Sequence, residues 1–392
     1  MSGRLAPAGL PLGAADVAAA ARGSRDPGAA RDRLIRALEE IYPGRSARLL
    51  SSGRAALTLL FEACRRLRPE RDIVAMGAYT CWSVPAAAVR AGLRVLPVDI
   101  DPEDLDFREE ALRRVEGGRV LALVTHHLFG HPNRRARSES AARAWGAFLI
   151  DDAAQGFGAE EKGSPAGGAG EGGILSFGRG KAIPALGGGA LLAEKGSDLD
   201  RAVRAPGGGG RGVLRPCRAA LQGIFLRPSL YGIPASIPAL GIGETVYDAS
   251  FPSGPLDGAT ASLAERLLRG RKAREEARRR RAAFYREEAA GLGLPLRFPQ
   301  APGLSSAIRC PAYAPAEKRD GAFRAARDLG VSAAYPAPVH RIPGIDPDRL
   351  APCEEPVGAE RIAREILTLP THPLVDDRRA REILRRIGEA IR

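Results

Sequence analysis

Between residues 73 and 193, short apolar runs alternate with segments of helical periodicity. Each run is bounded by polar residues or glycine, which is typical of a strand that is buried on both faces. Strands that alternate with helices are joined by crossovers, so the pattern predicts an α/β fold around a large, mostly parallel sheet. The predicted strands are 73–76, 95–100, 120–128, 147–150, 173–177 and 189–193.

The same pattern divides the chain into three parts. Residues 1–45 are predicted to form an N-terminal arm and a helix, which ends at Pro43-Gly44. Residues 46–250 are predicted to form the large sheet domain, and residues 251–392 a smaller C-terminal α/β domain. The strands predicted for the smaller domain are 305–310, 331–335 and 366–369.

Residues 206–245 form an apolar insertion in the large domain. Four glycines lead into this segment, and its prolines exclude a long helix. Two interpretations are open: the segment packs on the protein or on a partner subunit, or it touches a membrane surface. The chain contains neither a run of about 18 uncharged apolar residues nor an N-terminal signal pattern.

The net charge of +13 raises the question of nucleic-acid binding. The basic residues are almost all arginines, and they are spread along the whole chain. The densest basic run, 269–286, is interleaved with glutamates at helical spacing, as in a solvated helix face with ion pairs. We therefore expect no nucleic-acid partner, and the charge equally suits small anionic substrates.

The five cysteines are scattered and form no CxxC pair. This distribution predicts reduced thiols in a cytoplasm, and it indicates neither a disulfide framework nor a metal site. The cysteines are Cys64, Cys81, Cys217, Cys310 and Cys353.

Lys181 lies in a glycine-rich turn after a predicted strand and is one of only five lysines. Lysine can form a Schiff base with an aldehyde, whereas arginine stays protonated. Asp152 ends an earlier predicted strand, and pyridoxal phosphate needs both a lysine for its aldehyde and an acid for its ring nitrogen. Tyr79, His127 and Ser176 also follow predicted strands, at the edge of the sheet where ligands bind.

Several segments, taken in order, resemble the DegT/DnrJ/EryC1/StrS sugar aminotransferases, which are fold-type-I pyridoxal-phosphate enzymes with an aspartate-aminotransferase-like fold. The resemblance extends over nearly the whole chain, and the segments are specific jointly rather than singly. They are SGRAAL (52–57), GLRVLPVDIDP (92–102), HLFG (127–130), IDDAAQ (150–155), SFGRGK (176–181), PVH (338–340) and LPTHP (369–373).

The resemblance implies a role for each matching residue. Lys181 would hold the cofactor aldehyde and act as the base that moves a proton during transamination. Asp152 would pair with the ring nitrogen, and Gln155 would lie near the ring hydroxyl. Ser176 and the turn Ser52-Gly53-Arg54 would bind the phosphate.

Other positions stay open. The aromatic residue that stacks on the cofactor ring falls in the segment 79–82, where Tyr79, Cys81 and Trp82 are the alternatives. His127 is either a structural histidine beside the site or a substrate contact. His340 is a weak candidate for a substrate contact.

The chain departs from the family pattern in three places. Arg54 stands where the family usually has threonine, and the segment 251–256 lacks the asparagine or arginine that the neighbouring subunit commonly supplies. We expect Arg54 to compensate for that loss. The insertion 206–245 lies where relatives build part of the acceptor pocket, so the resemblance does not identify the acceptor.

The resemblance implies a homodimeric aminotransferase that moves an amino group, from glutamate, to a keto nucleotide sugar. Such sugars serve cell-surface polysaccharide or secondary-metabolite biosynthesis. One alternative is a sugar dehydratase with the same cofactor, although such relatives typically replace the lysine. The other is a non-catalytic, regulatory relative.

Overall fold

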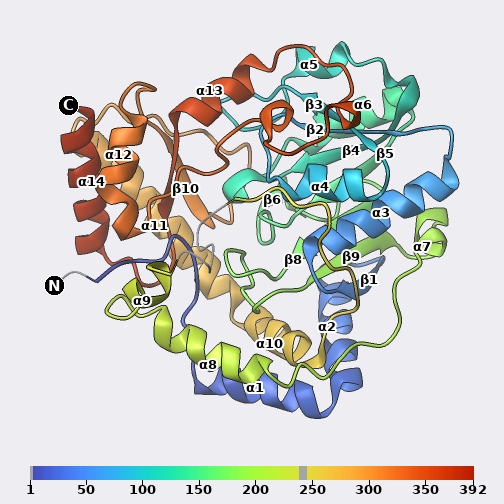
Figure 1. The fold of residues 1–392 in the computed structure, drawn as a ribbon, viewed down its shortest axis with the longest axis horizontal. Coiled ribbons are helices and arrows are strands. Elements are labelled where there is room, and N and C mark those ends of the chain that lie inside the picture. Colours follow the sequence, from blue (N-terminus) through green and yellow to red (C-terminus); the bar gives the residue numbers. More distant parts are fainter. Residues whose placement is uncertain (1–2, 238–244) are drawn as a thin grey trace.

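A seven-stranded sheet forms the centre of the molecule (Figure 1). The computed structural model describes residues 3–237 and 245–392. The strands lie in the order β1-β9-β8-β5-β4-β2-β3. Their bounds are β1 Arg45–Leu50, β2 Ile73–Gly77, β3 Arg94–Val98, β4 Val120–His126, β5 Phe148–Asp152, β8 Gly172–Ser176 and β9 Gly189–Glu194.

The sheet is mostly parallel, so the predicted fold class is confirmed. The five strands from β8 to β3 are parallel, whereas β9 runs antiparallel to both of its neighbours. The first strand, β1, was not predicted. Its sequence RSARLL is half polar, because β1 is an edge strand of the sheet and part of its surface is open to solvent.

Helices cover both faces of this sheet, since strand side chains alternate between two apolar cores. Leu57, Leu60 and Phe61 of α3 pack on one face, together with α4 and α7. The other face is covered by α2, α10 and α6. The bounds are α2 Pro27–Ile41, α3 Gly53–Leu67, α4 Ser83–Arg90, α6 Arg135–Trp145, α7 Asp198–Ala202 and α10 Gly258–Arg269.

A second, two-stranded sheet lies in the C-terminal part of the chain. Its antiparallel strands, β10 and β11, pack against a group of helices on the left of Figure 1. The elements are β10 Arg309–Tyr313, β11 Ile366–Pro370, α11 Arg271–Gly291, α12 Arg319–Ala326, α13 Val357–Glu365 and α14 Asp377–Ile391. The division at residues 45 and 250 stays a prediction.

The predicted strand at 331–335 is wrong. Only Ser332 forms a bridge, to Thr368 of β11. Tyr335 has a φ of +39°, which ends the extended conformation and turns its side chain toward Gln155. The strand predicted at 305–310 begins later, at Arg309.

The apolar insertion contains α8 Arg215–Phe225 and α9 Gly232–Ala235. Helix α8 lies beside α1 Ala14–Arg25 and buries its small residues Ala219 and Gly223 on that side (Figure 1). Leu221 and Ile224 face outward and are exposed. Residues 238–244, which belong to the same predicted insertion, lie outside the described residues.

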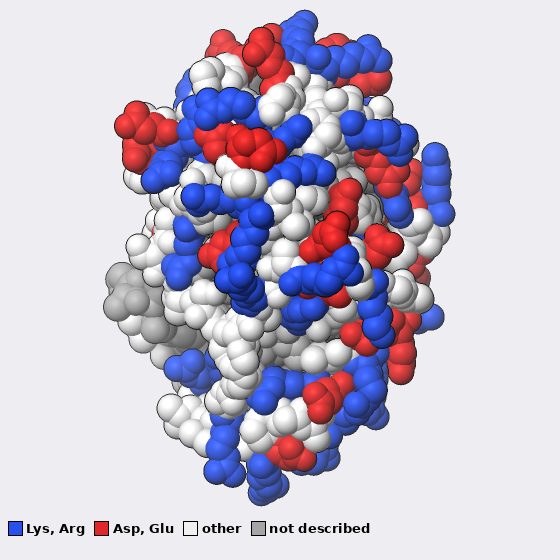
Figure 2. Space-filling model, turned by 90° about the vertical axis from the view of Figure 1, so that its right-hand side faces the viewer, with Lys and Arg blue, Asp and Glu red and all other residues white. Residues whose placement is uncertain are grey.

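Basic and acidic side chains are interspersed over the face shown in Figure 2. Many charged side chains of the described residues form ion pairs, such as Arg119 with Asp72 at 2.6 Å and Arg114 with Glu354 at 2.8 Å. In the part of the chain that the structure describes, every helix is too short or too polar to cross a bilayer.

Candidate active site

A cavity of about 130 Å³ lies at the carboxyl ends of the central strands. It is lined by residues from the predicted set, and these residues are far apart in the sequence. The structure therefore brings Lys181 together with the predicted acid, the predicted phosphate-binding turn and His127. The members of the predicted set that line the cavity are Ser52, Gly53, Arg54, His127, Asp152, Gln155, Ser176 and Lys181.

Two helices begin at this cavity. Ser52 caps α3, since its Oγ accepts a hydrogen bond from the backbone N–H of Ala55 at 3.1 Å. Helix α4 begins at Ser83, and both Ser83 and Thr80 line the cavity. Helix N-termini present free N–H groups and a positive dipole end, so this end of the cavity suits a phosphate.

Gly53 lies close against the end of β8. A Cβ there would lie 3.1 Å from Cβ of Ser176 and 3.5 Å from the carbonyl oxygen of Leu175. The start of α3 can therefore approach the end of β8, which places Ser52 and Ser176 on the same side of the cavity.

Asp152 is the last residue of β5 and is nearly buried. Burial raises its pKa, while the backbone N–H of Ala154 and the charge of Lys181 act in the opposite direction. One carboxylate oxygen accepts the N–H of Ala154 at 2.9 Å. No other hydrogen bond among the described residues occupies this carboxylate, so it is available to a protonated ring nitrogen.

The preceding residue, Asp151, is fully engaged in the protein. It accepts hydrogen bonds from Thr125 Oγ1 at 2.8 Å and from two backbone N–H groups, those of Gly167 and Ala169. His127 Nε2 lies 2.5 Å from its Oδ1. The backbone N–H of Asn133 donates to His127 Nδ1, so the proton of the imidazole is carried by Nε2.

Lys181 is half-buried and belongs to the turn that follows β8. Its backbone N–H donates to the carbonyl of Gly178 at 3.0 Å. From outside the turn, buried Arg278 of α11 donates to the carbonyl of Ala182 at 3.2 Å. These contacts hold the backbone on both sides of the lysine.

Gln155 connects the cavity to the C-terminal part of the chain. Its Oε1 accepts the backbone N–H of Phe129 at 3.1 Å, and its Nε2 donates to the hydroxyl of Tyr335 at 2.6 Å. Both groups of the amide are thus used, which fixes its orientation at the cavity wall.

Arg54 projects from the first turn of α3. Its guanidinium lies over the ring of Phe251 at 4.7 Å and reaches Asp248 at 3.9 Å. Asp248 and Phe251 follow the insertion, and Phe251 begins the segment 251–256, where the residue that the family's neighbouring subunit supplies is missing. The side chain remains one-third exposed and lines the cavity.

Three residues of the predicted set are not brought to the cavity. Tyr79 is fully buried and donates to the carbonyl of Ala334, and Trp82 packs in the core, with its Nε1 donating to the carbonyl of Ala337. His340 instead lies 3.0 Å from Glu360. Of the three alternatives for the ring-facing position, only Cys81 lines the cavity.

Thr80, Ser83 and Tyr335 were missed by the sequence interpretation. Thr80 lies within the open segment 79–82 and Ser83 follows it directly, so their hydroxyl groups shortly after the predicted strand 73–76 were the available signal. Tyr335 gave no such signal, because it lay in a wrongly predicted strand.

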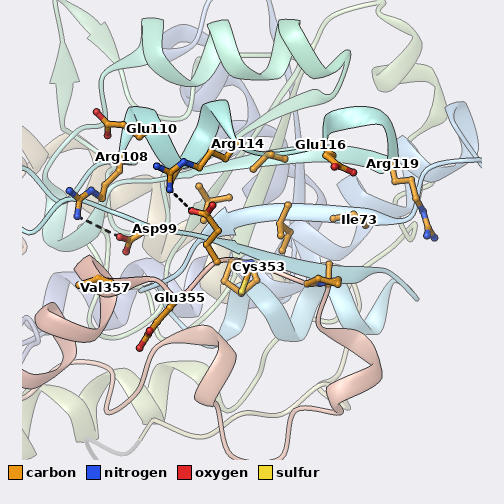
Figure 3. A pocket seen from close by; sticks show the side chains of 18 of the residues that line it. Ile73, Asp99, Arg108, Glu110, Arg114, Glu116, Arg119, Cys353, Glu355 and Val357 are labelled. Carbon is orange, nitrogen blue, oxygen red and sulfur yellow. Dashed lines mark hydrogen bonds and ion pairs between the residues drawn. The ribbon is translucent and has the colours of Figure 1, made fainter.

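A larger hollow of about 930 Å³ lies along the edge strand β3 (Figure 3). Arg108 faces Asp99 there at 3.8 Å, and Arg114 faces Glu354 at 2.8 Å. Its lining contains no lysine, and each of its three arginines is paired with an acid. The smaller Lys181 cavity is therefore the candidate active site.

The model of the DegT/DnrJ/EryC1/StrS aminotransferase family matches residues 15–212, which is half of the chain. The chain belongs to this family. The predicted family and enzyme class are therefore confirmed: the protein is an aminotransferase of a family that depends on pyridoxal phosphate.

The alignments with two curated relatives are longer than this match. The chain is 27% identical over 311 residues to the erythromycin biosynthesis sensory transduction protein EryC1 of Saccharopolyspora erythraea, which covers 77% of the chain and 74% of the relative. It is 25% identical over 344 residues to a UDP-N-acetyl-3-dehydro-alpha-D-glucosamine 3-aminotransferase of Acidithiobacillus ferrooxidans, covering 87% and 82%.

Solved structures share the fold. DesI, crystallised in the presence of its TDP-sugar product, is 22% identical, with a TM-score of 0.76 over 100% of this chain and 94% of that chain. E. coli GDP-4-keto-6-deoxy-D-mannose-3-dehydratase with bound hydrated PLP is 17% identical, with a TM-score of 0.75 and full coverage of both chains. At these identities the likeness shows the fold alone.

Proposed function

We propose that the Lys181 cavity binds pyridoxal phosphate and transfers an amino group, from glutamate, to a keto group of a nucleotide-linked sugar. The observation that carries the proposal is that Lys181 and Asp152, from separate strand ends, line one cavity with two helix N-termini. The donor set fits the cofactor, since it offers an amine, an acid and a phosphate site. When bound, the cofactor supplies an electron sink for the carbon that loses its proton.

Each residue then has one task. Asp152 would hold a proton on the ring nitrogen, and Gln155 would lie near the ring hydroxyl. Ser52, Arg54 and Ser176 would hold the phosphate. Lys181 Nζ would hold the cofactor aldehyde and would act as the base that accepts and returns the proton of the substrate carbon.

Support for a sugar acceptor comes from the relatives. The A. ferrooxidans relative is named for a UDP-sugar, and DesI was crystallised with a TDP-sugar. A homodimer and a cytoplasmic location stay predictions.

The presence of Lys181 argues against the dehydratase alternative, because such relatives typically replace this lysine. The regulatory alternative is supported by the relative EryC1, which is named as a sensory transduction protein. Transamination distinguishes the proposal from both alternatives.

The test is to incubate the purified protein with glutamate and a panel of keto nucleotide sugars. We expect absorption at about 410–430 nm, which glutamate removes and a keto sugar restores. Lys181→Ala should lack both this absorption and transamination. A Lys181→Ala protein that still transaminates would refute the assignment, and a wild-type protein without spectral change would favour the regulatory alternative.

A further inference from the structure

The outward side of helix α8 carries large apolar side chains that the described part of the chain leaves exposed. Leu214 directly precedes the helix, and Leu221 and Ile224 lie within it, three positions apart. Their exposed fractions are 66%, 50% and 44%. Ile233 of α9 is also exposed, and Figure 1 shows both helices at the margin of the molecule. Exposed apolar residues on one helix face indicate an interaction surface.

The inward side of α8 is already packed, so the exposed residues have no room there. A Cβ on Gly223 would collide with the backbone carbonyl oxygen of Leu12, and Ala219 is fully buried. Gln222 Nε2 donates to the carbonyl of Leu10 at 3.3 Å. Small residues thus bring α8 close to the N-terminal arm, while its large apolar residues point away from the protein. This orientation is the reverse of the one that would bury most apolar area within the chain.

The charge of this segment has one sign. Residues 201–243 contain six arginines and no aspartate or glutamate, although acids make up 46 of the 392 residues of the chain. Arg215 pairs with Asp257 at 3.1 Å. Arg218 and Arg227 are exposed, and neither is among the ion pairs of the part of the chain that the structure describes. The exposed apolar residues therefore lie in a segment whose positive charge is not neutralised locally.

We infer that the α8 surface, formed by Leu214, Arg218, Leu221, Ile224 and Arg227, binds a membrane surface that contains anionic lipids. Apolar side chains flanked by arginines suit the boundary between headgroups and acyl chains, because the apolar groups enter it and the guanidinium groups meet phosphates. Helix α8 has 11 residues, which is too short to cross a bilayer, so it would lie in the plane of the surface. The inference does not depend on the proposed function.

A second copy of the chain is the other candidate occupant of the α8 surface. In a dimer with twofold symmetry, the same patch lies on both sides of the contact. The α8 surface would then bring arginines of one subunit toward arginines of the other, and residues 201–243 supply no acid to separate them. Like charges oppose such a contact, whereas lipid phosphates neutralise the same charges. The charge therefore favours a membrane over a second copy.

The test is cosedimentation of the full-length protein with vesicles of phosphatidylcholine, either alone or in an equal mixture with phosphatidylglycerol. We expect binding to the mixed vesicles that salt weakens, and little binding to phosphatidylcholine alone. Leu221→Glu combined with Ile224→Glu should reduce the binding constant about tenfold or more, because the apolar contact is lost. The matched control combines Leu292→Glu with Val357→Glu, two exposed apolar residues outside the insertion, and should bind like the wild type.

The contribution of charge is tested separately. Arg218→Gln combined with Arg227→Gln should lower the binding constant for the mixed vesicles about 10- to 30-fold, at about fivefold for each arginine near an anionic surface. The same variant should also show a weaker dependence on salt. Arg324→Gln combined with Arg327→Gln removes equal charge from two exposed positions in the C-terminal part of the chain and should leave binding unchanged.

The inference is overturned if the wild type does not sediment with the mixed vesicles, or if it binds both kinds of vesicle equally. Wild-type binding by the Leu221→Glu, Ile224→Glu protein would also overturn it, provided that this variant keeps the circular dichroism of the folded protein. Sedimentation velocity without vesicles tests the other occupant. A wild-type dimer that this variant converts into monomers would refute the inference and assign the α8 surface to a contact between subunits.

Discussion

His127 Nε2 lies 2.5 Å from Oδ1 of Asp151, whereas the adjacent carboxylate, Asp152, lines the Lys181 cavity. Successive side chains of a strand point to opposite sides, so the two aspartates at the end of β5 meet different surroundings. Asp151 is surrounded by donors from the protein, and Asp152 is left for a ligand. One carboxylate thus stabilises the fold, and the other is available for chemistry.

Exchanging each carboxylate for an amide should separate these roles. Asp151→Asn should lower the free energy of unfolding by about 2–4 kcal/mol, because it replaces an acceptor of several buried donors. Asp152→Asn should leave the cofactor-free protein as stable as the wild type or slightly more stable, since burial disfavours the native charge. Urea unfolding measures both values, and a strongly destabilised Asp152→Asn would contradict the assignment.

Asp152→Asn should nevertheless reduce transamination by roughly 100-fold or more, because the ring nitrogen loses the acid that keeps it protonated. The cofactor should still bind, since the phosphate contacts are unchanged. Asp152→Glu serves as the comparison, because it keeps the charge but displaces it. Equal activity of Asp152→Asn and the wild type would show that another group protonates the ring.

Stability should depend on pH through Asp151. Burial alone raises the pKa of this carboxyl, but His127 and the backbone and hydroxyl donors lower it to about 2. Because the folded pKa lies below the ordinary value of about 3.9, the stabilisation is present above pH 4 and is lost as the pH falls toward 2. The contribution is about 2 kcal/mol. Urea unfolding at several pH values should show this loss in the wild type and a shallower one in Asp151→Asn.

Arg54 should contribute to phosphate binding. Arg54→Ala should weaken retention of pyridoxal phosphate by about 10- to 100-fold, because a charge-assisted contact to the phosphate is lost. Arg90→Ala is the control: this guanidinium also lies 4.7 Å above the ring of Phe251, but it does not line the cavity. Retention measured by absorbance after dialysis should fall only in the first variant, and equal retention would remove Arg54 from the site.

Alkylation of the cysteines should report cofactor binding without any enzyme assay. Cys217 and Cys353 are exposed and should react with iodoacetamide in both forms of the protein, whereas Cys64 and Cys310 are buried and should not. Burial also raises the pKa of Cys310 to about 12. Cys81 lines the cavity and should react only in the cofactor-free form. Peptide mass spectrometry gives the pattern, and unprotected Cys81 would place the cofactor elsewhere.

Much of the sheet could be predicted, because a strand buried on both faces is a short apolar run between polar ends. All six predicted runs overlap a strand of the large sheet, from β2 to β9, by most of their length. Strand β1 was not predicted by this rule, because polar residues occupy half of its positions, as in a strand that is partly open to solvent. The segment 331–335 met the rule but lacks the pairing that makes an apolar run a strand.

The sequence by itself determined which residues have the chemistry for the site: Lys181, Asp152 and the Ser52-Gly53-Arg54 turn. They could be found because the carboxyl ends of parallel strands meet at one edge of a sheet, wherever they occur in the chain. Only the tertiary structure decided that Cys81, rather than Tyr79 or Trp82, faces the cavity. The direction of a side chain in an irregular turn depends on the packing around it and not on any period in the sequence.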